Sequence, residues 1–281
     1  MLVIVLQGLA GFLSIIAILC QKRYNKLHRS IYGLSYDLFL LDFVGNGLYL
    51  YCALHYCYSS LVREQLSQRF PLFYPLNDAR SIPISSFLIL KDFCVSCCCM
   101  MVLRQLYYYR STKHIYQGIS ITSIIIISVF LVLGIFTYGC SISNLPLKNS
   151  GKFGVFYLEH INYLWVMANL LKCFKYVPQM SINWMGCSTV GLSSKFALIS
   201  FLAESIDLLG RLVIPTNALF YEIPFNSTPF WVKLIQFVTL LVILCQVQYV
   251  YVGRKPRLPK KENYNKVSSF STLMALRCLQ I

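Results

Sequence analysis

Residues 21–37 read QKRYNKLHRSIYGLSYD, and residues 179–195 read QMSINWMGCSTVGLSSK. Each stretch follows one apolar run and precedes another. A helix–polar loop–helix unit that occurs twice in an apolar chain is typical of transporters whose binding site lies between two halves. Aligned without a gap, the two stretches share six residues: Gln21/Gln179, Asn25/Asn183, Ser30/Ser188, Gly33/Gly191, Leu34/Leu192 and Ser35/Ser193.

The composition places the chain in a membrane. Hydrophobic residues make up 57% of the 281 residues, and charged residues make up only 12%. A soluble domain carries about 25% charged residues, so this chain lacks the charge to cover a soluble surface. The sequence therefore predicts an all-α integral membrane protein in contact with lipid, long enough for about seven spans of roughly 20 residues.

The basic residues indicate the orientation of the chain. The formal net charge is +15, which in a soluble protein would suggest nucleic-acid binding. Here Lys and Arg fall mainly in connections and in the C-terminal tail, so we expect no nucleic-acid partner. The first apolar run, 2–20, has no basic residue before it and a basic cluster after it, which predicts a retained span with a lumenal N-terminus. By the same rule the C-terminus is cytosolic.

Run length and flanking charge predict seven transmembrane helices, at about 2–20, 34–53, 83–103, 119–140, 155–177, 194–215 and 230–252. Both copies of the motif then have the same orientation, which makes this a parallel repeat. We expect two three-helix bundles joined by a linker helix (3+1+3). The expected divisions are 1–103 for the first bundle, 104–154 for the linker, 155–252 for the second bundle and 253–281 for a basic, disordered tail.

Four carboxylates are candidates for proton coupling. Asp42, Glu204 and Asp207 lie inside predicted spans, and Asp37 lies near the start of one. An unpaired buried carboxylate is costly when ionised, so such groups usually line a wet pathway or take up protons. Asp207 has an alternative interpretation, a local ion pair with Arg211 four residues later. Lys175 is expected to extend to the cytosolic surface.

The repeated polar residues are candidates for the substrate pathway. Gln21 and Gln179 occupy matching positions, as do Asn25 and Asn183. The amide side chains of the two asparagines either bind polar groups of an amino acid or tie down the loop backbone. Pro178 either forms a hinge at the mouth of a polar cavity or merely ends a helix.

Other chemistry finds no support in the sequence. Consecutive cysteines at 97–99 would point in different directions on a helix, and no His stands at ligand spacing, so no metal site is expected. Phosphate loops, nucleophile elbows and HExxH motifs are absent from the sequence, which predicts neither an enzyme nor a cofactor. Asn226 begins an N-glycosylation sequon on the predicted lumenal side.

The stretch 176–193, YVPQMSINWMGCSTVGLS, and the weaker first copy resemble the PQ-loop repeat family, in particular its cystinosin-like members. The family is related to the SWEET carriers. The resemblance implies a seven-helix carrier that exports an amino acid such as cystine, with protons, from the lysosome or vacuole to the cytosol. Asp37 falls on the acidic residue after the family's first loop, and Lys233 lies near a substrate-binding lysine. Ser200 falls on the family's proton-coupling aspartate.

The serine at this position leaves two outcomes open. Either Glu204 or Asp42 takes over the proton, or coupling is lost. The alternatives to a carrier are a heptahelical sorting receptor that retrieves lumenal peptides and a transport-inactive regulator of the endomembrane system. Tyr264 begins YNKV, which fits a tyrosine-based motif for a sorting adaptor.

Overall fold

The computed structural model describes residues 2–74, 82–114, 117–143, 152–213 and 223–254, without the side chains of residues 2 and 3. Helices dominate these residues, and no strand occurs among them. Short 3-10 turns and a π-helical segment, Gln246–Val250, complete the regular structure. The α-helices are α1 (Leu2–His28), α2 (Tyr36–Tyr58), α3 (Ser60–Arg69), α4 (Ser86–Tyr108), α5 (Ile121–Ile142), α6 (Tyr157–Cys173), α7 (Val177–Gly186), α8 (Ser194–Leu212) and α9 (Phe230–Cys245).

Five helical segments of the described chain are long and apolar enough to cross a membrane: Ile4–His28, Tyr36–Tyr58, Ser86–Tyr108, Ile121–Ile142 and Phe230–Val250. The remaining two predicted spans have a different character. The span predicted at 155–177 is divided between α6 and α7, because the chain turns at residues 174–176. The span predicted at 194–215 is α8, whose 19 residues include four charged side chains: Lys195, Glu204, Asp207 and Arg211.

The structure corrects two local predictions. The motif at 21–37 was expected to be mainly a polar loop, but α1 continues through it to His28, so Gln21 and Asn25 lie on a helix and only residues 29–35 form the connection. The helix continues because the polar segment contains good helix formers and the Gln21 and Asn25 side chains share one buried face. The stretch 54–82 was expected to be a loop, but it contains α3, which begins where the Ser59 side chain accepts a hydrogen bond from the Val62 N–H.

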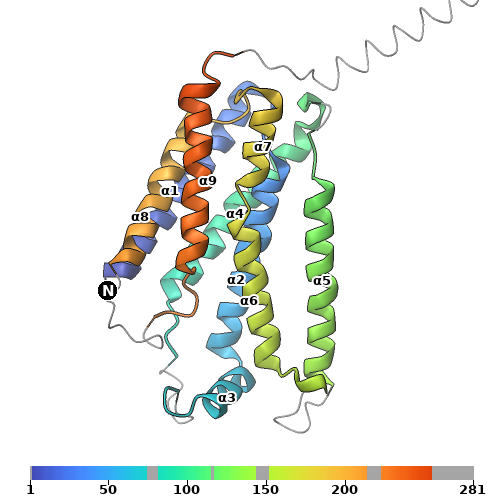
Figure 1. The fold of residues 1–281 in the computed structure, drawn as a ribbon, viewed down its shortest axis with the longest axis vertical. Helices are drawn as coiled ribbons and strands as arrows, with labels where there is room; N and C mark the ends of the chain where they lie inside the picture. The colour runs from blue at the N-terminus through green and yellow to red at the C-terminus, as the bar shows by residue number, and fades with distance from the viewer. Residues whose placement is uncertain (1, 75–81, 115–116, 144–151, 214–222, 255–281) are drawn as a thin grey trace, which may run out of the picture.

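The long helices of the two repeats pack in equivalent pairs (Figure 1). Helix α4 packs against α1 and α2, and α9 packs against α6 and α8. Across these two groups, α1 packs against α8 and α2 packs against α6. Exchanging α1 with α6, α2 with α8 and α4 with α9 turns each of these contacts into another one of the set. Helix α5 packs mainly against α6, at the edge of the molecule.

Many apolar side chains lie on the outside of the structure and many polar ones lie inside, the reverse of a soluble protein. Helix α5 leaves most of its isoleucine, leucine and valine side chains exposed, whereas Gln, Asn, Lys, Asp and Glu side chains lie buried among the other helices. Lipid rather than water is the solvent that suits such an exterior. The predicted disordered tail, including Tyr264, lies outside the described residues apart from its first two positions.

Candidate functional site

Gln21 joins the end of α1 to the loop before α8. The Gln21 amide Nε2 donates to the Gly191 carbonyl oxygen at 3.0 Å, and Gln21 Oε1 accepts from the Ser193 N–H at 2.9 Å. The side chain is fully buried. A single amide thus satisfies one backbone acceptor and one backbone donor of the other repeat.

Gln179 makes the same contacts in the opposite direction. Its Nε2 donates to the Gly33 carbonyl oxygen at 3.0 Å, and its Oε1 accepts from the Ser35 N–H at 2.8 Å. Gly33 and Ser35 are the repeat equivalents of Gly191 and Ser193. Each glutamine therefore binds the loop of the other copy at equivalent atoms.

Two asparagines and two further glutamines extend this arrangement. Gln21 Nε2 donates to Asn25 Oδ1 and Gln179 Nε2 donates to Asn183 Oδ1, both at 2.8 Å. The asparagine amides in turn donate to Oε1 of Gln105 on α4 and of Gln246 after α9, at 3.4 and 2.9 Å. We call the side chains of Gln21, Asn25, Gln179 and Asn183, with loop residues 33–35 and 191–193, the glutamine clasp.

The two loops of the clasp touch through glycine. A Cβ atom on Gly191 would overlap the Tyr32 carbonyl oxygen and lie 2.8 Å from the Gly33 carbonyl carbon. Gly33 has φ +78°, a left-handed conformation that glycine adopts without strain. Gly191 is therefore required by the close approach of the two loops, and Gly33 by its left-handed backbone conformation.

The contacts of the two asparagines in the clasp agree with the interpretation that they tie down the loop backbone. Asn25 and Asn183 orient the glutamine amides that hold the loop backbone, so they act on loop structure. Pro178 lies in the first turn of α7, where its missing N–H would have no helical partner in any case. It begins a helix after the turn at 174–176 and does not kink the middle of one.

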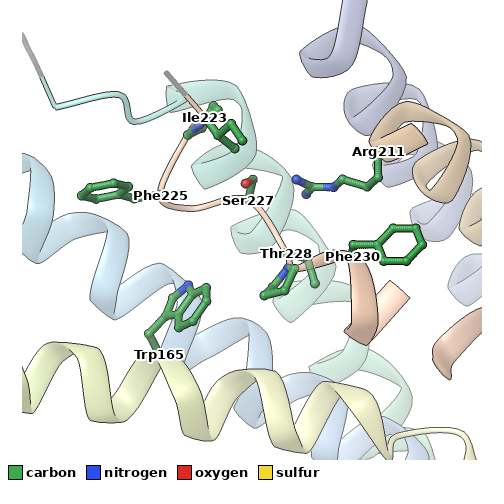
Figure 2. A pocket seen from close by; sticks show the side chains of 9 residues that line it. Trp165, Arg211, Ile223, Phe225, Ser227, Thr228 and Phe230 are labelled. Carbon is green, nitrogen blue, oxygen red and sulfur yellow. The ribbon is translucent and has the colours of Figure 1, made fainter. Parts of the chain in front are cut away.

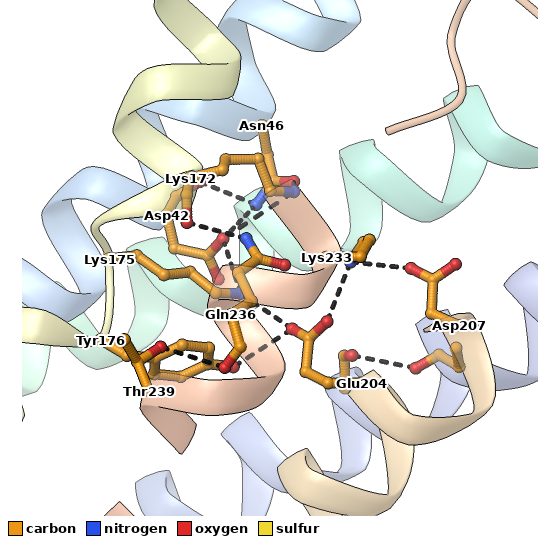
Figure 3. A network of polar contacts seen from close by, with 12 residues as sticks. Asp42, Asn46, Lys172, Lys175, Tyr176, Glu204, Asp207, Lys233, Gln236 and Thr239 are labelled. Carbon is orange, nitrogen blue, oxygen red and sulfur yellow. Dashed lines mark hydrogen bonds and ion pairs between the residues drawn. The ribbon is translucent and has the colours of Figure 1, made fainter. Parts of the chain in front are cut away.

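A second cluster lies deeper in the bundle and contains charged groups from four segments (Figure 3). Lys175 Nζ lies 3.4 Å from Asp42 Oδ1 and 3.5 Å from Glu204 Oε1. Lys233 Nζ lies 3.0 Å from Glu204 Oε2 and 2.7 Å from Asp207 Oδ2. With Lys172 these residues form the ion network, and all of them are buried.

Lys172 completes the network on the α2 side. Its Nζ donates to Asn46 Oδ1 at 2.5 Å and lies 4.0 Å from Asp42 Oδ1. Its backbone carbonyl accepts from the Gln236 amide at 2.8 Å. Asp42 therefore faces two lysines of the α6 region, and Lys175 connects α2 to α8 through its two carboxylate partners.

The network surrounds a cavity of only about 30 Å³, lined from α1, α2, α4, α6, α8 and α9. One water molecule takes about this volume in the liquid. One carboxylate oxygen of Asp207 and the Gln236 side-chain oxygen, both buried, have no hydrogen-bond partner in the described part of the chain. The central cavity is thus small and surrounded by paired charges, and two buried acceptor oxygens have no partner among the described residues.

The structure corrects two predictions about charged residues. Lys175 does not extend to the surface: it is 7% exposed and pairs with Asp42 and Glu204. Asp207 pairs with Lys233 instead of Arg211. Arg211 instead donates to the Gln7 side-chain oxygen, with Nε 3.1 Å away, in the amide orientation that satisfies both groups.

The remaining candidates lie outside the network. Both carboxylate oxygens of Asp37 accept from the Ser120 N–H, at 3.1 and 3.2 Å, so this residue holds the start of α5 to α2. Ser200 is buried on α8, one helical turn before Glu204. The Asn226 side chain is buried, donating to the Ser85 carbonyl oxygen and accepting from the Ser85 N–H. No group of three His, Cys, Asp or Glu residues that could hold a metal ion occurs among the residues with described positions.

A larger cavity opens at the end of the bundle opposite the clasp (Figure 2). Its volume is about 500 Å³. Trp165 of α6, Arg211 of α8 and Phe230 of α9 line it together with the connection 223–229. We call it the outer cavity. Arg211 lies one helical turn beyond Asp207, so this cavity adjoins the ion network.

The sequence of the chain is similar to those of known proteins. No family model matches the chain. Cystinosin homologs of Caenorhabditis briggsae and Caenorhabditis elegans are 28% and 26% identical to it over 200 residues, and cystinosin of Drosophila melanogaster is 23% identical over 195 residues. The chain resembles cystinosin. This confirms the resemblance expected from the repeated motif.

The cystinosin-like similarity covers about 70% of this chain but 44% of each relative. The chain thus spans less than half the length of the curated relatives it matches. Lys172 and Lys175 are the residues of the ion network that the sequence prediction missed. Their signal was available: two lysines three residues apart in an apolar run, with no acidic residue within one helical turn of either.

Proposed function

We propose that the chain is a cystinosin-like, proton-coupled secondary transporter that moves an amino acid such as cystine from the lumen of the lysosome or vacuole to the cytosol. The ion network carries this proposal. It places three lysines and three carboxylates, all buried, between the two sets of helices related by the repeat. Buried charges within a membrane usually mark a substrate or proton pathway.

The proposed architecture is 3+1+3. In it α1, α2 and α4 form the first bundle, α5 is the linker, and α6 with α7, α8 and α9 form the second, within the divisions 1–103, 104–154, 155–252 and 253–281. The exchange of packing pairs between the two sets of helices supports this. The reciprocal contacts of Gln21 and Gln179 support it independently, because equivalent side chains bind equivalent atoms across one axis.

The network favours a zwitterionic substrate. Its lysines supply donors for a carboxylate, and the partnerless Asp207 oxygen is an acceptor for an amino group. Lys233, which pairs with both Glu204 and Asp207, would exchange these partners for the substrate carboxylate. The amino acid would thus replace existing ion pairs instead of leaving buried charges unpaired.

The closed centre favours alternating access. The clasp closes one end, the centre holds about 30 Å³, and a 500 Å³ cavity opens at the other end. Opening the clasp end requires the two bundles to separate across Lys175, whose partners Asp42 and Glu204 belong to different bundles. Protonation of Asp42 would weaken the Lys175–Asp42 pair that crosses between the bundles, and protonation of Glu204 would weaken its pairs with Lys175 and Lys233 inside the second bundle. We therefore assign the proton to these two residues, with Asp207 as the substrate-facing carboxylate.

We assign the clasp end to the cytosol. The basic residues that follow α1 and α4 lie at this end, and anionic cytosolic surfaces retain such residues. The N-terminus would then be lumenal and the outer cavity would face the lumen. A sorting adaptor at Tyr264 and a glycan at Asn226 remain expectations, and the glycan would need the Asn226–Ser85 contacts to open first.

The test is counterflow in proteoliposomes across a panel of amino acids that includes cystine, with and without a pH gradient. We expect gradient-stimulated uptake of at least one member. Asp42→Asn and Glu204→Gln should retain counterflow but lose the stimulation by the gradient. Glu64→Gln, which changes a carboxylate on α3 outside the network, is the matched control and should behave as the unmodified chain.

Two outcomes would contradict the carrier. One is no uptake of any amino acid by folded protein, and the other is uptake that ignores the gradient. Binding of lumenal peptides at acidic pH without flux would instead support a sorting receptor. A transport-inactive regulator would show neither flux nor any effect of the two amide variants.

A further inference from the structure

The outer cavity has the size of a ligand site and, among the described residues that line it, a single charged side chain. Its volume of about 500 Å³ falls in the range of small-molecule sites, roughly 300–1,000 Å³. Arg211 is the charged residue among the side chains that line it. Figure 2 shows the guanidinium of Arg211 pointing toward Ser227 and Thr228, with Trp165 and Phe225 on the far side.

The Arg211 and Trp165 side chains at this cavity offer hydrogen-bond donors. Within the described residues no carboxylate lies within 4.0 Å of the Arg211 guanidinium, whose partner is the neutral amide of Gln7. The indole Nε1–H of Trp165 is buried and has no hydrogen-bond partner in the described structure. Arginine and tryptophan side chains can only donate. Gln7 accepts from Nε, Nη1 and Nη2 of Arg211, which leaves two of the five guanidinium N–H groups, and these together with the Trp165 N–H suit an acceptor from outside the chain.

The remaining walls are mainly apolar. Ile223, Phe225 and Phe230 supply aliphatic and aromatic surface, with two prolines of the connection between them. A planar carboxylate matches the guanidinium fork in a bidentate arrangement, and an apolar group attached to it matches the aromatic walls. A phosphate or sulfate without an apolar part would leave these walls without a contact.

We propose that the outer cavity is a binding site for the carboxylate of an amphipathic solute, held by Arg211 and Trp165 with its apolar side chain against Phe225 and Phe230. The inference rests on the proposed carrier function and specifies its substrate class, an amino acid with an apolar or aromatic side chain. A solute bound here lies about one helical turn from Asp207, whose partnerless oxygen is the next acceptor along α8.

Trp165 provides the measurement. The chain has three tryptophans, and Trp184 and Trp231 are exposed, so the full-length Trp184→Phe/Trp231→Phe variant leaves Trp165 as the reporter. Its emission is titrated with L-leucine and L-phenylalanine, and in parallel with leucinamide and phenylalaninamide, which lack the carboxylate. We expect saturable changes with the two acids and apparent affinities at least about tenfold weaker with the amides.

Arg211 variants test the assigned contact. In the reporter background, Arg211→Gln should weaken the affinity for L-phenylalanine by about tenfold or more. The affinity of Arg211→Lys should lie between those of the arginine and glutamine forms, because lysine keeps the charge but loses the bidentate geometry of the guanidinium. Thermal unfolding verifies that each variant is folded. The comparison of acid with amide needs no Arg211 variant, so the test remains decisive even where Arg211→Gln fails to fold.

Lys233→Gln separates this inference from the carrier proposal. It should abolish flux through the central network while the Trp165 titration remains unchanged. Carboxylate-selective Trp165 signals together with no flux in the chain that retains Lys233 would support the site and contradict the carrier. Gradient-driven transport with equal Trp165 responses to acid and amide, or with no response to either, would overturn the site and leave the carrier standing.

Discussion

At Gly191 the backbones of the two repeats approach each other closely. A Cβ atom there would meet backbone atoms of Tyr32, Gly33 and Leu34, none of which can rotate away as a flexible side chain would. The neighbouring hydrogen bonds from Gln21 to Gly191 and Ser193 fix the loop against movement. Tolerance of a larger residue at this position would therefore require the clasp to open.

Gly191→Ala is expected to destabilise the protein by about 1–3 kcal/mol, the usual cost of overpacking. The measurement is thermal unfolding in detergent. Gly47→Ala is the matched control: nothing lies within 4 Å of a Cβ there, and the substitution on α2 should be neutral or stabilising by up to about 1 kcal/mol. Equal melting temperatures for the two variants would show that the loops do not meet as described.

At the scale of the elements, α1 and the α6–α7 pair are repeat equivalents with different shapes. Helix α1 is continuous through Cys20, whereas residues 174–176 interrupt the second copy and α7 starts at Val177 with Pro178 next. Lys175 lies in this interruption, and the turn lets its side chain reach Asp42 and Glu204. The break therefore positions the residue that joins the two bundles.

Pro178→Ala is expected to lower the turnover of the proposed carrier by about an order of magnitude, or about 1.4 kcal/mol in the barrier, with KM nearly unchanged. The reason is that alanine permits α6 to extend into α7 and so redirects Lys175. Initial counterflow rates measure the effect, and Cys20→Ala at the equivalent position of α1 serves as control. Unaltered turnover would show that the break survives without proline.

The sequence predicted these elements to different degrees. The apolar runs and the repeat were sufficient to predict the long helices and the matched positions of Gln21 and Gln179. They could not predict that α1 continues past Cys20, because a polar helical face reads as a loop until its buried partners are known. Helix α3 was missed for a similar reason: it is short, polar and held by contacts with α6.

Some residues of the candidate site were predicted from the sequence and others were not. Each carboxylate was found because an acidic residue is conspicuous in an apolar run. Lys172 and Lys175 were not, because a lysine near a helix end normally extends to the surface. Only the positions of Asp42 on α2 and Glu204 on α8 explain why Lys175 is buried, and those positions depend on packing between distant segments.

For the whole molecule, the ion network makes stability and conformational change depend on the same contacts. Lys175 has carboxylate partners in both helix sets, so separation of the sets breaks at least one buried pair. Removing one member of a buried pair leaves an uncompensated charge, which is far more costly than the loss of a surface pair.

Lys175→Gln is expected to destabilise the protein by about 3–5 kcal/mol, and Lys175→Gln combined with Asp42→Asn should recover part of this loss because the second change removes the unpaired charge. A double-mutant cycle on unfolding measures the coupling. Breaking the more exposed Arg69–Glu159 pair by Glu159→Gln should cost under about 1 kcal/mol. Strictly additive effects of Lys175→Gln and Asp42→Asn would contradict the bridge.

The glutamine clasp also accounts for how far the two copies have diverged. The amides of Gln21 and Gln179 bind peptide groups, so the side chains of the partner loop are free to differ. All six shared positions serve this one junction: the glutamines and asparagines make the contacts, Ser30 and Ser188 close the turns, Gly33 and Gly191 permit the approach, and buried Leu34 and Leu192 precede the bound N–H of Ser35 and Ser193. A search for other chains with this duplication can therefore look for these few positions at fixed spacing and disregard the identity of the residues between them.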